Sequence, residues 1–88
     1  MIKDDQLYID HILDCIRKIN DFSRGLSLKE FRTSELVQDA IIRNIEIIGE
    51  ASKKISSDTK DAYQNIPWKE ISGMRDKLIN DYLRGIIA

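Results

Sequence analysis

The sequence predicts an all-α protein, an antiparallel bundle of helices. Three long segments, at residues 4–23, 34–56 and 67–82, carry apolar residues at spacings of three and four, the period of a helix that is buried on one side. Ser, Thr, Gly and Pro, which favour helix ends, lie between these segments. Together these observations indicate helices joined by short connections around a common core.

Length and composition limit what this bundle can be. A chain of 88 residues forms one small domain, and a domain of this size buries only about 60–65% of the surface of its unfolded chain, so a monomer has little stability to spare. The hydrophobic fraction of 42% is sufficient for a core and argues against disorder. The formal net charge of −1 gives no overall basic field, so any contact with RNA must come from a local patch.

Several kinds of site and location are disfavoured. Cys15 and His11 are the only residues of their types, so the sequence supports neither an intrachain disulfide nor a Cys- or His-based metal cluster. We predict no metal and no cofactor. The acidic N-terminus does not resemble a signal peptide, and no apolar run approaches the roughly 18 residues of a membrane span. We therefore expect a cytoplasmic protein that does not enter a membrane.

The first helix is expected over residues 4–23. Its apolar face consists of Tyr8, Ile9, Ile12, Leu13, Cys15, Ile16, Ile19 and Phe22. Gly25 is predicted to end the helix, because glycine readily adopts the conformation of a C-terminal cap. His11 borders the apolar face, where it is either a structural or solvated residue or a catalytic base. Cys15 is interpreted as a small core residue.

Short-range signals predict the next two helix starts. Ser27 and Glu30 have the spacing of a capping box, which indicates one or two helical turns. Thr33 or Ser34 is then predicted to cap the following helix.

The helix at 34–56 is the strongest structural signal in the chain. One apolar seam is made of Val37, Ile41, Ile45, Ile48 and Ile55, and a second of Ala40, Ile47 and Ala51. Because so small a domain cannot bury both seams, we expect one to pack on its own chain and the other on a second copy. Gly49 costs about 1 kcal/mol of helix propensity relative to Ala, which indicates a close approach of another backbone.

A polar stripe follows the same helix. Asp39, Arg43, Glu46 and Glu50 are spaced by four, three and four residues. Such a stripe is either a solvated face with ion pairs along it or part of the lining of a polar cleft.

The last helix is expected after a polar connector at 56–66, in which Asp58 could cap a single turn. Pro67 suits the first position of a helix, where its missing N–H would be unpaired in any case. The helix is predicted to continue to Tyr82. Gly73 would allow a bend or a close approach.

The end of this helix concentrates side chains that could form a site: Arg75, Asp76, Asn80, Asp81 and Tyr82. Arg75 and Asn80 are about 140° apart around a regular helix, so a site that uses both needs a local bend or a groove shared by two copies. Two copies of Arg75 would supply the positive charge that the chain lacks, and the planar guanidinium can hold a phosphate bidentately. From the residues alone, capping and packing roles are the alternative.

Four segments carry a resemblance to a known family. They are Tyr-Ile-Asp-His-Ile-Leu (8–13), Leu-Ser-Leu-Lys-Glu-Phe (26–31), Gln-Asp-Ala-Ile-Ile-Arg-Asn-Ile-Glu-Ile-Ile-Gly-Glu-Ala (38–51) and Ile-Pro-Trp-Lys-Glu-Ile-Ser-Gly-Met-Arg-Asp-Lys-Leu-Ile (66–79). Over nearly its whole length the chain resembles the HepT-like toxins of the HEPN superfamily, which are small all-helical proteins. The last two segments are the most specific.

The resemblance implies a metal-independent endoribonuclease that works as a homodimer, the toxin of a type VII-like toxin–antitoxin pair. The family motif is Arg, four residues, His, one residue, Tyr. Arg75 matches its arginine, which would hold the scissile phosphate of the RNA substrate, and Tyr82 matches its tyrosine. A minimal nucleotidyltransferase antitoxin would neutralise the toxin by adding AMP to Tyr82. The family's cleft is bordered by polar residues, and the positions similar to them here are Asp39, Asn44, Glu46 and Glu50.

Two departures from the family pattern bear on function. Position 80, where the motif has His, is Asn. An imidazole exchanges protons near neutral pH and an amide does not, so Asn80 would keep a hydrogen bond but remove general acid–base catalysis, a loss of about 100- to 10,000-fold. The chain also ends in Leu-Arg-Gly-Ile-Ile-Ala (83–88), where family members continue into a further helix. We therefore expect residues 1–88 to be a single HEPN-like domain that lacks this helix.

The sequence thus predicts a toxin with impaired ribonuclease activity that pairs with a nucleotidyltransferase. One alternative is a non-catalytic dimeric HEPN module that binds a nucleotide or a protein. A remnant that folds and dimerises without activity is a third reading.

Overall fold

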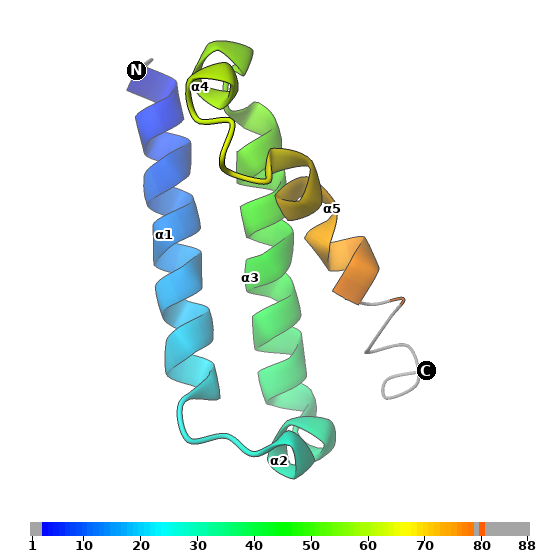
Figure 1. Cartoon of the computed structure of the whole chain (residues 1–88). Coiled ribbons are helices and arrows are strands. Elements are labelled where there is room, and N and C mark those ends of the chain that lie inside the picture. Colours follow the sequence, from blue (N-terminus) through cyan, green and yellow to red (C-terminus); the bar gives the residue numbers. More distant parts are fainter. Residues whose placement is uncertain (1–2, 79, 81–88) are drawn as a thin grey trace.

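The computed structural model describes residues 3–78 and 80, which form five helices and contain no β-strand. The helices are α1 (Lys3–Ser23), α2 (Leu28–Thr33), α3 (Glu35–Lys54), α4 (Ser57–Ala62) and α5 (Trp68–Leu78). α1 and α3 lie side by side in opposite directions and are connected through α2 at one end of the bundle, while α4 follows α3 at the other end (Figure 1). α5 returns along α3 (Figure 1). The predicted all-α antiparallel bundle is confirmed; dimerisation stays a prediction.

The predicted stop of α1 and the predicted caps of α2 and α3 are found at the expected residues. Gly25, just after α1, has a φ of 70°, a conformation that glycine adopts without strain. The Glu30 N–H donates to the Ser27 hydroxyl, and the Ser27 N–H donates to the Glu30 carboxylate, which completes the capping box of α2. Of the two candidate caps for α3, Ser34 takes the position, and its hydroxyl accepts from the Val37 N–H.

The core lies mainly between α1 and α3, the two helices with the most extensive contact. Four residues of the first seam are buried: Ile41, Ile45 and Ile48 of α3 and Ile55, which caps it. Cys15 of α1 is buried as well. Cys15 is therefore the core residue that the sequence predicts, and its burial raises the pKa of its thiol. In the second seam Ala51 is buried while Ala40 and Ile47 are half-buried.

The connector is more ordered than the sequence predicts. Residues Ser57–Ala62 form α4, and its cap is Ser56, whose hydroxyl accepts from the Thr59 N–H. The expected cap at Asp58 is wrong, because Asp58 lies inside the first turn. Pro67 directly precedes α5, and its carbonyl accepts the first helical hydrogen bond, from the Ile71 N–H.

A carboxylate from α1 fastens the start of α4. Asp5, only 2% exposed, accepts hydrogen bonds from the Ser56 N–H at 2.9 Å, the Ser56 hydroxyl at 2.6 Å and the Thr59 hydroxyl at 2.6 Å. The hydrogen bonds from Ser56 and Thr59 hold the pKa of Asp5 below its ordinary value, because they favour the charged form. The contact joins residues more than fifty positions apart, so no local sequence pattern predicts it.

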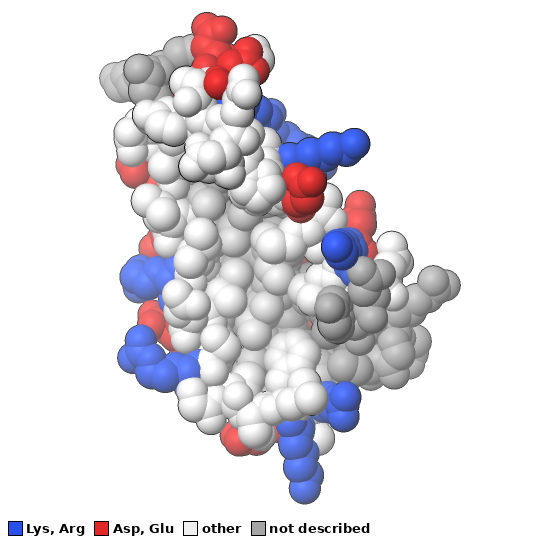
Figure 2. All heavy atoms as spheres, in the orientation of Figure 1, with Lys and Arg blue, Asp and Glu red and all other residues white. Residues whose placement is uncertain are grey.

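One face of the molecule is largely uncharged. Figure 2 shows Lys, Arg, Asp and Glu mainly around its margins. An apolar groove of about 250 Å³ lies between α1 and the α4–α5 region, lined by Ile9, Ile12, Leu13, Thr59, Tyr63, Ile66, Trp68 and Ile71. Even so, none of the helices in the described part of the chain is long and apolar enough to cross a lipid bilayer.

Candidate functional site

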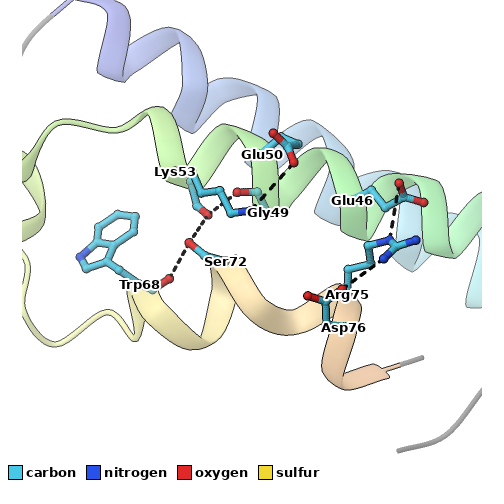
Figure 3. A network of polar contacts seen from close by, with 9 residues as sticks. Glu46, Gly49, Glu50, Lys53, Trp68, Ser72, Arg75 and Asp76 are labelled. Atoms are coloured by element: carbon cyan, nitrogen blue, oxygen red, sulfur yellow. Dashed lines mark hydrogen bonds and ion pairs between the residues drawn. The ribbon is translucent and has the colours of Figure 1, made fainter. Parts of the chain in front are cut away.

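A polar cleft lies where α5 crosses α3. Its cavity has a volume of about 240 Å³ and is lined by Glu46, Gly49, Glu50 and Lys53 from α3 and by Ser72, Arg75 and Asp76 from α5. The four α3 residues follow the spacing i, i+3, i+4 and i+7, which puts them on one face of the helix. Figure 3 shows Ser72 and Arg75 of α5 turned toward α3, where Arg75 meets Glu46.

Close contact between backbones sets the width of this cleft. A Cβ atom added at Gly49 would lie 3.3 Å from the Ser72 carbonyl oxygen, so any larger residue would push α5 away. This confirms the close approach that Gly49 predicts. Gly73, the other candidate, has no neighbouring atom within 4 Å of its Cβ position. The close-approach reading of Gly73 is therefore wrong.

Hydroxyl groups join the two helices at the same point. The oxygens of Ser52 and Ser72 are 3.0 Å apart, and Ser52 has no exposed surface. Each hydroxyl has one proton, so one serine donates to the other, and the serine that accepts donates to a carbonyl of its own helix, Gly49 for Ser52 or Trp68 for Ser72 (Figure 3). Because Ser72 and Arg75 are three residues apart, this anchor fixes the helical face that carries Arg75.

Arg75 is held between two carboxylates. Its Nε lies 3.6 Å from Glu46 Oε2 on α3, and its Nη1 donates to Asp76 Oδ1 at 3.1 Å (Figure 3). The Arg75 side chain is 47% exposed, so solvent screens both pairs and each contributes little to stability. A guanidinium that is partly paired and still open to solvent can exchange a carboxylate for a phosphate.

The ionisable groups of the cleft do not make it basic. Its lining contains two cationic residues, Lys53 and Arg75, and three carboxylates, those of Glu46, Glu50 and Asp76. The lining therefore carries a formal charge of −1. The described residues contain no group of three or more His, Cys, Asp or Glu side chains placed to hold a metal ion.

The structure brings together some of the predicted site residues and separates others. Glu46, Glu50 and Asp76 line the cleft beside Arg75. Asp39 is exposed and outside the lining. Asn44 is buried, and its side-chain amide donates to the Ala40 carbonyl of its own helix, so it does not reach the cleft.

The remainder of the motif lies at the edge of the described chain. Asn80 is exposed and has a π-helical conformation. Among the described residues no hydrogen bond connects the side chains of Arg75 and Asn80. Asp81 and Tyr82 lie outside the described residues.

Besides Gly49, which the sequence singles out only as a packing position, two residues of the lining, Lys53 and Ser72, are absent from the predicted site. A signal for Lys53 exists in the sequence, because it is seven residues after Glu46 on the face that contains Gly49. Ser72 has no such signal, since its role depends on where α5 crosses α3.

The chain is similar in sequence to known proteins of one family. A family model described as Ribonuclease HepT-like matches residues 12–84. The chain is 45% identical over 82 residues to the "Gamma-glutamylcyclotransferase and putative RNase" of Methanocaldococcus jannaschii, a match that covers 93% of this chain and 37% of that protein. It is 44% identical over 75 residues to the "Probable ribonuclease HepT" of Thermococcus cleftensis, with 85% and 68% covered.

A bacterial relative, the "Putative RNase" of Caldanaerobacter subterraneus, is 39% identical over 75 residues, with 85% of this chain and 67% of the relative covered. The chain thus spans about a third of the first relative and about two thirds of the other two. No solved structure matches it significantly. The match over residues 12–84 shows that this chain belongs to the HepT-like ribonuclease family.

Proposed function

We propose that this chain is the RNA-binding toxin half of a toxin–antitoxin pair and that its ribonuclease activity is impaired because Asn80 replaces the motif histidine. The observation that carries the proposal is the position of Arg75, a solvent-accessible guanidinium in a polar cleft between α3 and α5. In this role Arg75 exchanges Glu46 for a phosphate of RNA. Asn80 makes a hydrogen bond to the RNA but does not transfer protons.

Restoring the histidine tests the catalytic half of the proposal. We expect Asn80→His to cleave a fluorescently labelled RNA in the presence of EDTA about 100- to 10,000-fold faster than the unaltered chain. Adding Arg75→Ala to Asn80→His should abolish the gain. Arg43→Ala, a change at an exposed arginine of α3 outside the cleft lining, is the matched control and should leave the gain intact. Absence of cleavage by Asn80→His would refute the catalytic proposal.

The motif tyrosine, Tyr82, suggests the protein partner. We propose that a minimal nucleotidyltransferase adds AMP to Tyr82. Incubation with that enzyme and ATP should increase the mass of the chain by AMP units. Tyr82→Phe should prevent the increase, while Tyr63→Phe, at a tyrosine 48% exposed, should not. An unmodified chain would favour the inactive remnant.

The proposed site is shared by two copies of one HEPN-like domain that comprises residues 1–88. A second Arg75 is needed because a single cleft is formally negative. Sedimentation equilibrium at micromolar concentration should therefore show a dimer. A monomer would argue against the shared site.

The formal charge of the cleft and the residue at position 80 also favour a second candidate function, a non-catalytic module that binds a nucleotide or a protein. This candidate predicts that Asn80→His leaves RNA intact and that Arg75→Ala does not change RNA binding.

A further inference from the structure

Lys53 lies at the end of the cleft opposite Arg75. Glu46, which pairs with Arg75, is seven residues before Lys53, so the two positions are about 10.5 Å apart along α3 on one face. Gly49 lies between them and leaves the floor of the cleft open up to the Ser72 backbone. The two cationic side chains of the lining therefore flank the cavity at either end (Figure 3).

The Lys53 ammonium is only loosely engaged. Its Nζ is 4.0 Å from Glu50 Oε1, and the side chains of Lys53 and Glu50 are 60% and 71% exposed. An exposed pair at this distance contributes little energy. A phosphate that entered the cleft would displace it at small cost, as at Arg75.

From this arrangement we infer that Lys53 is a second phosphate contact, so that the cleft binds the backbone of single-stranded RNA across at least two phosphates. One phosphate lies at Arg75 and another at Lys53. The inference rests on the proposed RNA binding. A cavity of about 240 Å³ between two packed helices accommodates a sugar–phosphate segment but is far too small for a duplex. Because each bound phosphate releases counterions, the number of contacts can be measured from the salt dependence of binding.

The neighbouring residue offers a matched control. Lys54 has the same charge and the same helix turn, but its Nζ lies 5.8 Å from the centre of the Tyr8 ring of α1, away from the cleft. Lys53→Gln and Lys54→Gln therefore change the net charge of the protein equally. Only the first removes a charge from the cleft.

The experiment measures binding of a fluorescein-labelled oligouridylate to the full chain by anisotropy over a range of salt concentrations. We expect Lys53→Gln to weaken binding about threefold to tenfold and to reduce the slope of log K against log salt by about 0.7, the value for one phosphate on a single strand. Lys53→Arg should keep the slope, and Lys54→Gln should behave as the unaltered chain.

Two other outcomes separate the inference from the proposed function. If Arg75→Ala lowers affinity and slope but Lys53→Gln matches Lys54→Gln, the second contact is refuted and RNA binding stands. If Arg75→Ala changes neither, the proposed function itself is refuted. Equal competition by duplex RNA would overturn the single-strand assignment.

Discussion

Glu46 and Arg75 form an ion pair of 3.6 Å between α3 and α5, across the mouth of the polar cleft. The pair stabilises the free cleft and competes with any anion that binds there. Removing the Glu46 carboxylate should therefore weaken the α3–α5 contact in the free protein but strengthen the binding of an anion, and this difference separates the two roles.

Replacing Glu46 by Gln should strengthen binding of an oligoribonucleotide about twofold to fivefold. The change frees Arg75 from one competitor worth roughly 0.2–1 kcal/mol and brings the formal charge of the lining to zero. Anisotropy titration is the measurement, with Asp39→Asn, a carboxylate of α3 outside the lining, as the control. Weaker binding by Glu46→Gln would mean that Glu46 is needed to orient Arg75.

The two glycines of the crossing should respond differently to alanine. Gly73→Ala adds a methyl group to open space in α5, so we expect a gain of about 0.5–1 kcal/mol in the free energy of unfolding. Gly49→Ala brings the same gain in propensity but crowds the Ser72 carbonyl at 3.3 Å. Its net effect should fall short of that of Gly73→Ala by roughly 1 kcal/mol. Urea denaturation measures both, and equal gains would contradict the close approach.

Asp5 should make stability depend on acid. Hydrogen bonds from Ser56 and Thr59 lower the pKa of Asp5 in the folded chain. The free energy of unfolding that Asp5 contributes is therefore fully present above the pKa that Asp5 has in the unfolded chain, and it is lost as the pH falls through its pKa in the folded chain. We expect Asp5→Asn to lower the urea midpoint at neutral pH and to flatten the decline below about pH 4. Asp4→Asn changes an exposed carboxylate in the same first turn, and its urea midpoint should still decline below about pH 4 as in the unaltered chain. A similar curve for both variants would argue against the hydrogen-bonded role of Asp5.

Features that depend on near neighbours could be predicted from the sequence. The capping box of Ser27 and Glu30 and the stop at Gly25 need only residues within a few positions. Gly49 was predictable for another reason: a glycine costs helix propensity at its position and so indicates that another backbone comes close.

Features that depend on how helices meet could not be predicted in this way. Asp5 and Ser56 approach each other only because the start of α1 and the start of α4 lie at the same end of the bundle. For the same reason the polar stripe of α3 left two readings open, and the crossing of α5 decides between them by placing Glu46 and Glu50 in the cleft. Asn44 was placed near the cleft by resemblance, whereas the burial of its side chain is set by the rotation of α3.

The Asp5 contact also bears on the order in which the chain folds. α4 has six residues, too few to persist as an isolated helix, and its first turn is secured by a carboxylate that arrives from the other end of the chain. Such a contact can form only after α1 and α3 have paired, because the entropy of closing the long intervening loop must be lost first. α4 should then be a separate low-stability unit that opens without global unfolding, and its amide protons should exchange with solvent well before those at the centre of α3.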